Sequence, residues 1–170
     1  MNLLLEFGAT FLGVIASFSL WFGGQKLLQY QNEKKARKHL IAELEEETKL
    51  LIGVLDVSAT SIITCLQSRE IPVYLPKLFF PTYQYANSSG EIRLIKNNEI
   101  ETLIRQSAYV CQGFNEFINN TELQLSLFNF KPQPIALELA HHRLKGFLEQ
   151  SKDTKKFLQN TLSKLAILNN

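Results

Sequence analysis

The chain has 170 residues, of which 45% are hydrophobic and 20% charged, and its formal net charge is +2. This length, less a membrane anchor, leaves room for one soluble domain with its own core. From Leu40 onwards, 13 Lys and Arg stand against 14 Asp and Glu, which excludes the strongly basic surface that duplex DNA requires.

Residues 7–25, FGATFLGVIASFSLWFGGQ, form a run of 19 positions without an ionisable side chain. A helix of this length crosses the hydrocarbon core of a bilayer. Cations on the C-terminal flank of a span hold that flank in the cytoplasm, and five follow here: Lys26, Lys34, Lys35, Arg37 and Lys38. We predict a transmembrane helix over residues 1–25, single-pass in the cell inner membrane, with the C-terminal domain cytoplasmic.

A cleaved signal peptide and a buried helix of a soluble protein are the alternatives to an anchor. Export signals begin with a basic segment, whereas MNLLLE contains no Lys or Arg and carries the acidic Glu6. The basic residues instead follow the apolar run. We therefore favour an uncleaved anchor over both alternatives.

Small residues recur within the predicted span at Ala9, Gly13 and Ser17, spaced by four. Such stripes let transmembrane helices approach closely, which predicts a homo-oligomer held together by the span. The alternative is an anchor that stays single, because glycine is common in membrane helices anyway. Residues 26–49 are predicted to form a basic juxtamembrane or stalk helix that contacts anionic lipid headgroups, each cation contributing about 1 kcal/mol.

Residues 25–67 show an almost unbroken helical pattern. Apolar and small residues follow a three-four spacing at Leu40, Leu44, Leu51, Leu55, Ser58, Ile62 and Leu66. Either a long helix enters the core of the domain, or it forms a coiled-coil stalk between copies. Residues 50–66 are apolar enough for a second span, but Asp56 near the middle would cost about 2.5–3.5 kcal/mol there.

Residues 50–170 are predicted to form a cytoplasmic helical bundle. Pro72, Pro76 and Pro81 rule out one continuous helix after residue 70, and Pro81 opens a short helix that stops at Gly90. The aromatic residues here are core lining or a lid, or else a rim that stacks on a flat ligand: Tyr74, Phe79, Phe80, Tyr83 and Tyr85.

Two further helices complete the bundle. Asn98 with Glu101 resembles the start of a capped helix, which buries Ile100, Leu103, Ile104, Ser107, Cys111, Phe114, Phe117 and Ile118. A last helix runs over residues 135–168 after the break at Pro132 and Pro134. Residues 91–95, EIRLI, are the only strand candidate. The fold class is therefore all-α, with one N-terminal transmembrane helix followed by a small cytoplasmic bundle.

Motifs that carry chemistry are missing from this sequence. It contains no GxSxG, P-loop, GxGxxG or HExxH, and Cys65 and Cys111 stand far apart, without the spacing of a zinc site. In the cytoplasm both are expected to be reduced thiols. We predict no catalytic residues, no metal and no cofactor, and hence no enzyme.

The stretch PTYQYANSSGEIRLIKNNEIETLIRQSAYV resembles an element of small bacterial single-span membrane proteins with a helical cytoplasmic domain. One group with this layout is the membrane effectors of type III CRISPR phage defence that bind cyclic oligoadenylate. This architectural resemblance implies an antiviral effector with a cyclic oligonucleotide ligand. It assigns no binding residues.

Two functions follow as expectations. In the first, an oligomeric membrane effector senses an anionic, cyclic nucleotide-like signal and perturbs the membrane. Its candidate ligand contacts are Tyr83, Tyr85, Arg93, Lys96, Arg105, His141, Arg143 and Lys145. For residues 141–145 the simpler interpretation is a solvated basic face. In the second, a membrane-tethered helical adaptor recruits a protein partner.

Overall fold

The computed structural model describes the backbone of residues 3–72, 74–129 and 134–169, and the side chains of residues 17–72, 74–126 and 137–168. Its elements are α1 (Leu3–Ser68), α2 (Pro81–Ser89), η1 (Glu91–Ile95), α3 (Asn98–Asn129) and α4 (Pro134–Asn169). Over these ranges every regular element is helical, which confirms the all-α fold. The strand interpretation of residues 91–95 is wrong, because these residues form the 3₁₀ helix η1.

The chain divides into two compact units, Met1–His39 and Leu40–Asn170. The first consists of the N-terminal part of α1, and the second contains the rest of α1 and all other elements. The boundary at His39 lies before residue 50, where the sequence pattern predicts that the bundle begins. When the three-four spacing of the buried residues in α1 is continued towards the N-terminus, the next positions are Arg37 and Lys34. Charged residues do not line a core, so the buried stripe ends there.

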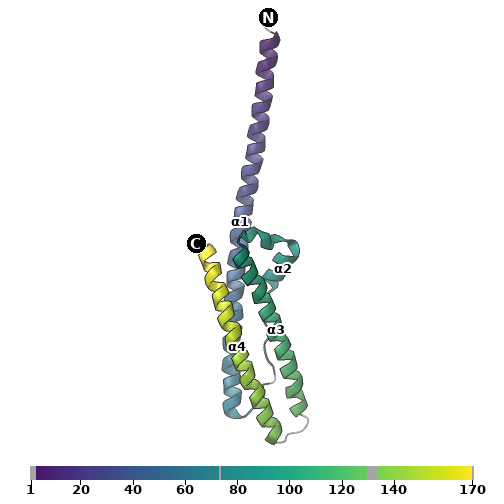
Figure 1. Cartoon of the computed structure of the whole chain (residues 1–170), viewed down its shortest axis with the longest axis vertical. Coiled ribbons are helices and arrows are strands. Elements are labelled where there is room, and N and C mark those ends of the chain that lie inside the picture. Colours follow the sequence, from purple (N-terminus) through teal and green to yellow (C-terminus); the bar gives the residue numbers. More distant parts are fainter. Residues whose placement is uncertain (1–2, 73, 130–133, 170) are drawn as a thin grey trace. The chain divides into compact units, whose positions relative to one another are not determined.

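The helices α1, α3 and α4 run alongside one another in the second unit (Figure 1). Each contributes to the core a stripe of buried residues with alternating spacings of three and four. In α1 the stripe is Ile41, Leu44, Thr48, Leu51, Leu55, Ser58 and Ile62. In α3 it is Ile100, Ile104, Ser107, Cys111, Phe114, Ile118, Thr121 and Leu125. In α4 it is Ala140, Leu144, Phe147, Ser151, Thr154, Leu158, Thr161 and Leu165. A period of 3.5 residues gives a left-handed bundle with interlocking side chains.

The stripe of α1 is therefore covered by other helices of the same chain. A coiled-coil stalk between copies through Leu40–Ile62 is excluded, and the helix enters the domain core instead. The same packing favours a bundle helix over a second span: Leu51, Leu55 and Ile62 are buried against other helices, and Asp56 pairs with Lys155 of α4 at 2.5 Å.

Hydroxyl side chains occupy several core positions among the described residues. Most of these hydroxyls donate a hydrogen bond to the backbone carbonyl four residues earlier, as Thr48 does to Leu44 at 2.7 Å. Ser107 of α3 and Thr161 of α4 also join the two helices through a 2.9 Å hydrogen bond. Beside these small residues, the rings of Phe114 and Phe147 pack with centroids 5.0 Å apart. The core is thus mainly aliphatic, with a pair of Phe rings and several small hydroxyl side chains among the Leu and Ile residues.

Residues 74–80, called the strap here, run along α3 without regular secondary structure. Leu75 donates its backbone N–H to Glu122 Oε1 at 3.2 Å, and Leu78 donates to Asn115 Oδ1 at 2.7 Å. Asn115 Nδ2 in turn donates to the Leu78 carbonyl at 2.6 Å. The strap is therefore antiparallel to α3, and a single carboxamide satisfies both backbone groups of Leu78.

Local signals set the ends of the short elements. Pro81 occupies the first turn of α2, and Gly90 ends it with φ of 80°, a left-handed conformation that glycine adopts without strain. Both were expected from the sequence. The predicted cap of α3 is displaced by one residue, because Asn97 Oδ1 accepts the Ile100 N–H at 3.1 Å. Asn98 is instead the first residue of the helix.

α1 is the one helix from Ser17 onwards that is long and apolar enough to cross a membrane, judged by length and composition. Its most apolar stretch in that range is residues 50–67, which belongs to the bundle. Core helices of soluble proteins pass the same criterion. The predicted span over residues 7–25 lies largely outside the described side chains, so its membrane insertion stays a prediction.

Candidate functional site

A pocket of about 350 Å³ opens where the strap, α2 and α3 meet. The strap contributes Leu78, Phe79 and Phe80, α2 contributes Tyr83 and Gln84, and α3 contributes Ala108, Tyr109, Cys111, Gln112 and Asn115. Pro76 and Pro81 prevent a continuous helix through the strap. The strap is extended along α3, where Phe79 and Phe80 line the pocket. The lining is aromatic and amide, without a charged side chain.

Aromatic rings form the rim of this pocket. Phe79 and Tyr109 are about two-thirds exposed, at 66% and 71%, and Tyr83 is half-buried against Phe80, with ring centroids 5.8 Å apart. Exposed rings of this size beside a hollow offer faces on which a flat ligand stacks. Gln84 and Gln112 also line the pocket with carboxamides, which both donate and accept hydrogen bonds; Gln112 Nε2 donates to Glu116 Oε1 at 3.1 Å.

Arg105 lies one turn before Ala108 and Tyr109 on α3. Its Nη2 pairs with Glu101 Oε1 at 2.8 Å, and its Nη1 donates to Asn87 Oδ1 at 2.9 Å. The hydrogen bond to Glu101 is the main cause that raises the pKa of Arg105. Arg105 thus joins α3 to α2 through Asn87, one turn before the pocket residues Ala108 and Tyr109, and it supplies a cation on the two helices that border the neutral cavity.

The buried end of the pocket contains a thiol that stays protonated. Burial raises the pKa of Cys111 to about 12, and the nearby Glu47 carboxylate adds to the shift. Burial also raises the pKa of Glu47, although its Oε1 accepts the Thr82 N–H at 3.0 Å. A thiol with this pKa is no nucleophile at neutral pH.

Of the ligand contacts expected from the sequence, Tyr83 lines the pocket and Arg105 lies beside it. Tyr85, Arg93 and Lys96 are exposed on the neighbouring α2 and η1 segments and do not line it. Tyr109, Gln84 and Gln112 were missed. Tyr109 and Gln112 lie on α3 outside its apolar face, so the sequence pattern of that helix gave no reason to single them out. They line a pocket only because the strap folds against α3.

The remaining expected contacts, His141, Arg143 and Lys145, lie near the start of α4. That helix is antiparallel to α3, because Lys164 near its end pairs with Glu99 at 3.1 Å. Thr161 of α4 contacts Ser107, which is two residues from Arg105 on α3. His141 lies twenty residues before Thr161 on α4, so the two positions are about 30 Å apart along that helix. One chain therefore does not bring Arg105 and His141 to a single ligand.

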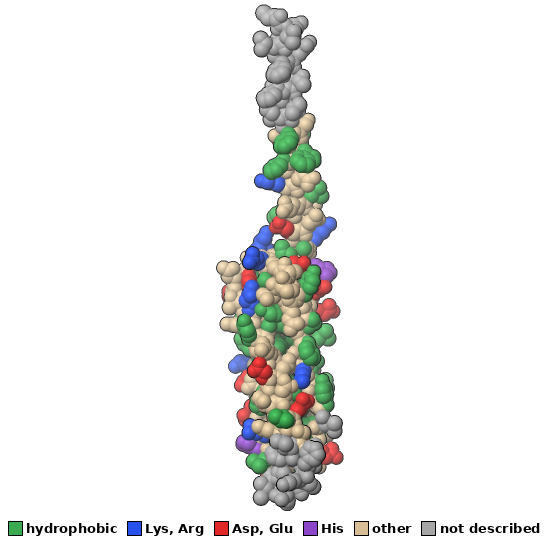
Figure 2. Space-filling model, turned by 90° about the vertical axis from the view of Figure 1, so that its right-hand side faces the viewer, with side chains coloured by type: hydrophobic (Ala, Val, Ile, Leu, Met, Phe, Trp, Pro, Cys, Tyr) green, Lys and Arg blue, Asp and Glu red, His purple; other side chains and the backbone are tan. Residues whose placement is uncertain are grey.

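Metal ligation finds no support in the part of the chain that the structure describes, where no group of three His, Cys, Asp or Glu side chains gathers. On the face of the bundle drawn in Figure 2, acidic and basic side chains are interspersed with hydrophobic ones. Of the predicted oligomerisation residues, Ser17 is exposed, whereas the side chains of Ala9 and Gly13 lie outside the described residues.

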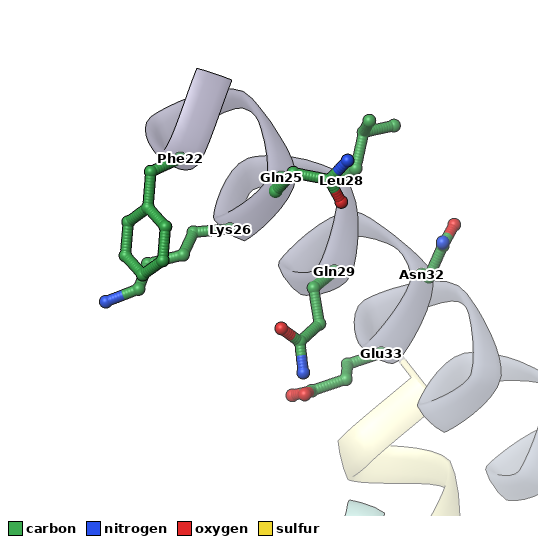
Figure 3. A pocket seen from close by; sticks show the side chains of 7 residues that line it. All are labelled: Phe22, Gln25, Lys26, Leu28, Gln29, Asn32 and Glu33. Atoms are coloured by element: carbon green, nitrogen blue, oxygen red, sulfur yellow. The ribbon is translucent and has the colours of Figure 1, made fainter. Parts of the chain in front are cut away.

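The first unit has a hollow of its own along α1, lined by Phe22, Gln25, Lys26, Leu28, Gln29, Asn32 and Glu33 (Figure 3). All seven residues belong to one helix, so the hollow is a groove on its surface. Lys26 Nζ lies 5.0 Å from the centroid of the Phe22 ring, within cation–π range.

Comparisons of this chain with protein-family models, with curated proteins and with solved structures find no match. The functional argument therefore rests on the residues and geometry above.

Proposed function

We propose that this protein is a membrane-anchored oligomeric effector whose cytoplasmic bundle senses an anionic, nucleotide-like signal and perturbs the membrane in response. The observation that carries the proposal is the pocket without charged side chains, lined by aromatic and amide residues, together with Arg105, which bonds to Asn87 of α2 one turn before the pocket residues of α3. The antiviral setting and the cyclic oligonucleotide as signal follow the architectural resemblance of the sequence.

The pocket offers the three kinds of contact that single nucleotides need. A base stacks on the exposed faces of Tyr109 and Phe79, as bases do on aromatic side chains of RNA-binding proteins. Carboxamides from Gln84 and Gln112 match the mixed donor and acceptor edge of a base. Arg105 then pairs with a phosphate, in exchange for part of its contact with Glu101.

Signalling needs a ligand that binds two states of the protein differently. The strap and α2 are suited to this role, because they are held against the helices by side-chain contacts from Glu47, Asn115 and Glu122. A ligand between α2 and α3 would change the balance of those contacts. The response reaches the membrane through α1, which contributes Glu47 to the α2 contact and contains the predicted anchor.

The predicted anchor places the protein in the cell inner membrane with the bundle in the cytoplasm. Five cations and one anion occupy residues 26–38, a distribution that favours the cytoplasmic side and anionic lipid headgroups. The small residues of the span support association of copies, which would let a change in the bundles alter the packing of the spans.

The test is native mass spectrometry of the full-length protein in detergent, with and without a panel of cyclic oligonucleotides. We expect one oligomeric species to gain the mass of one nucleotide. Arg105→Gln should weaken this binding about tenfold or more, because it removes a charge-assisted contact to phosphate. Arg143→Gln is the matched control on α4, and it should bind as the parent protein does. The proposal is contradicted if the parent protein binds no cyclic oligonucleotide, or if Arg105→Gln and Arg143→Gln weaken binding equally.

An anchored adaptor that recruits a protein partner is the second candidate. The exposed rings of Phe79, Tyr85 and Tyr109 favour it, since aromatic side chains are enriched at protein interfaces. Gly13→Ile separates the two functions. Loss of membrane permeabilisation with normal membrane targeting supports the effector, whereas unchanged function supports the adaptor.

A further inference from the structure

The charges of the juxtamembrane part of α1 leave one face of the helix free of charge. Positions with alternating spacings of three and four carry Phe22, Gln25, Gln29, Asn32, Ala36 and His39. We call this set the seam. All six charged residues between positions 22 and 39 occupy other places: Lys26, Glu33, Lys34, Lys35, Arg37 and Lys38.

In heptad notation Phe22, Gln29 and Ala36 are a positions, and Gln25, Asn32 and His39 are d positions. Lys34, Arg37 and Lys38 then occupy f, b and c, on the side of the helix farthest from the seam. All six seam residues are exposed within the chain. A basic stretch that only contacted lipid headgroups would need no such partition of charges.

The groove drawn in Figure 3 lies on this seam. The side chains of Phe22, Lys26, Gln29 and Glu33 project to one side, and those of Leu28 and Asn32 to the other. In a coiled coil, four residues at positions i, i+3, i+4 and i+7 form the hole that receives a side chain of the partner helix. The groove contains two consecutive sets of this kind, 22-25-26-29 and 25-28-29-32.

We infer that the seam is the contact between copies of this chain, which associate as a parallel, in-register coiled coil next to the predicted span. The inference deepens the proposed function and takes its membrane anchor as given. The occupant is a second copy because carboxamides are self-complementary. When identical helices lie parallel and in register, Gln25, Gln29 and Asn32 each meet their own counterpart and exchange a donor for an acceptor.

The flanking positions agree with the parallel arrangement. In a parallel coiled coil, a g residue meets the e residue five positions later in the other helix. Leu28 would then meet Glu33, and Trp21 would meet Lys26, so these pairs involve no like charges. A common anchor also keeps copies parallel and raises their effective concentration, which offsets the lower stability of a polar seam.

Disulfide crosslinking of the full-length protein in membranes tests the inference. Cys65→Ser removes the half-buried thiol, while Cys111 is buried and stays protonated. In this background, Gln29→Cys places a thiol on the seam, and Gln31→Cys places one on the outer face two residues later. Both are exposed glutamines, so neither change disturbs packing.

Under mild oxidation we expect Gln29→Cys to convert most of the protein to a covalent dimer and Gln31→Cys to remain mainly monomeric. Equal crosslinking of both variants, crosslinking of neither, or a covalent product with a different protein would overturn the inference.

A second pair of variants gives a readout that needs no crosslink. Gln29→Lys puts like charges opposite each other in the seam, so it should shift native mass spectra towards monomer, whereas Gln31→Lys should not. The pocket lies in the other unit, so nucleotide binding to the same samples is read separately. Dissociation with retained nucleotide binding supports the seam. If Gln29→Lys leaves the oligomer unchanged, the seam is not the contact between copies. If the parent protein binds no nucleotide, the proposed function is contradicted and the inference about the seam is not affected.

Discussion

At the scale of single residues, Glu47 links the bundle to the pocket. Its carboxylate accepts the Thr82 N–H in the first turn of α2, where no side chain of α2 itself provides a cap. Burial nevertheless raises its pKa above the ordinary value of 4.5. The folded state therefore holds the proton more tightly than the unfolded state. The resulting stabilisation is complete below about pH 4.5 and is lost as the pH rises through the raised pKa.

Glu47→Gln keeps an oxygen that accepts the Thr82 N–H and removes the titration. We expect the stability of this variant relative to the parent protein to increase as the pH rises from 4 to 7, measured by urea unfolding at each pH. Glu46→Gln makes the same change of charge at an exposed position and is the control. A stability of Glu47→Gln relative to the parent protein that falls between pH 4 and pH 7 would contradict the direction of the pKa shift.

Thr154 is a second residue whose environment predicts a change in stability. Its Oγ1 is buried and has no hydrogen-bond partner in the described part of the chain. Thr154→Val replaces this hydroxyl with a methyl group of similar size. We expect it to stabilise the protein by about 1 kcal/mol, which raises the Tm by about 3 °C.

Thr161→Val is the matched control on the same helix. It removes the hydrogen bond that joins Thr161 to Ser107, and we expect it to lower stability by about 1 kcal/mol. Thermal unfolding followed by circular dichroism compares the two. Destabilisation by Thr154→Val as large as that by Thr161→Val would mean that the Thr154 hydroxyl has a partner.

At the scale of elements, the strap depends on one side chain of α3. Asn115 makes both hydrogen bonds to the Leu78 backbone, in a segment that has no regular secondary structure to satisfy those groups. Asn115→Ala leaves a partly buried donor and acceptor unpaired, so we expect a loss of about 2 kcal/mol in unfolding free energy. The pocket should lose its shape together with the strap, because Leu78, Phe79 and Phe80 line it.

Asn119→Ala, one turn later on α3 and exposed, controls for the loss of a carboxamide from the helix. Hydrogen exchange at the Leu78 amide is the local readout, and it should accelerate in Asn115→Ala alone. Similar exchange in both variants would show that the strap is held mainly by its buried apolar residues.

At the scale of the whole molecule, the division at His39 makes a prediction about folding. The unit Leu40–Asn170 contains the complete set of buried stripes from α1, α3 and α4. We therefore expect a chain of residues 40–170 to be soluble and helical and to unfold cooperatively in urea, followed by circular dichroism. The full-length protein should sediment with membranes and resist extraction by alkaline carbonate, because it contains the predicted span. The shorter chain lacks the span and should stay in the supernatant.

Aggregation of the shorter chain would mean that residues 1–39 complete its core. Release of the full-length protein by carbonate would instead contradict the membrane anchor. The two measurements thus separate the folding of the bundle from the location of the protein.

The helices of this fold were predictable because their signals are local. Pro81 and Gly90 delimit α2, and the three-four spacing identified most of the buried faces of α1 and α3 before any packing was known. The cap of α3 was missed by one residue, since Asn97 and Asn98 are both capping residue types and only the backbone distinguishes them. Residues 91–95, the one strand candidate in the sequence, form a 3₁₀ turn after the left-handed Gly90, in keeping with the all-α prediction.

The sequence by itself determined the helical class, the registers of the buried stripes and the uncharged run that predicts an anchor, because each depends on neighbours within a few turns. Only the tertiary structure decided what meets across the chain. It placed the strap against Asn115, gathered Tyr109 and Gln112 with Tyr83 around a pocket, and separated Arg105 from His141. These outcomes depend on contacts between residues tens of positions apart, which no local period encodes.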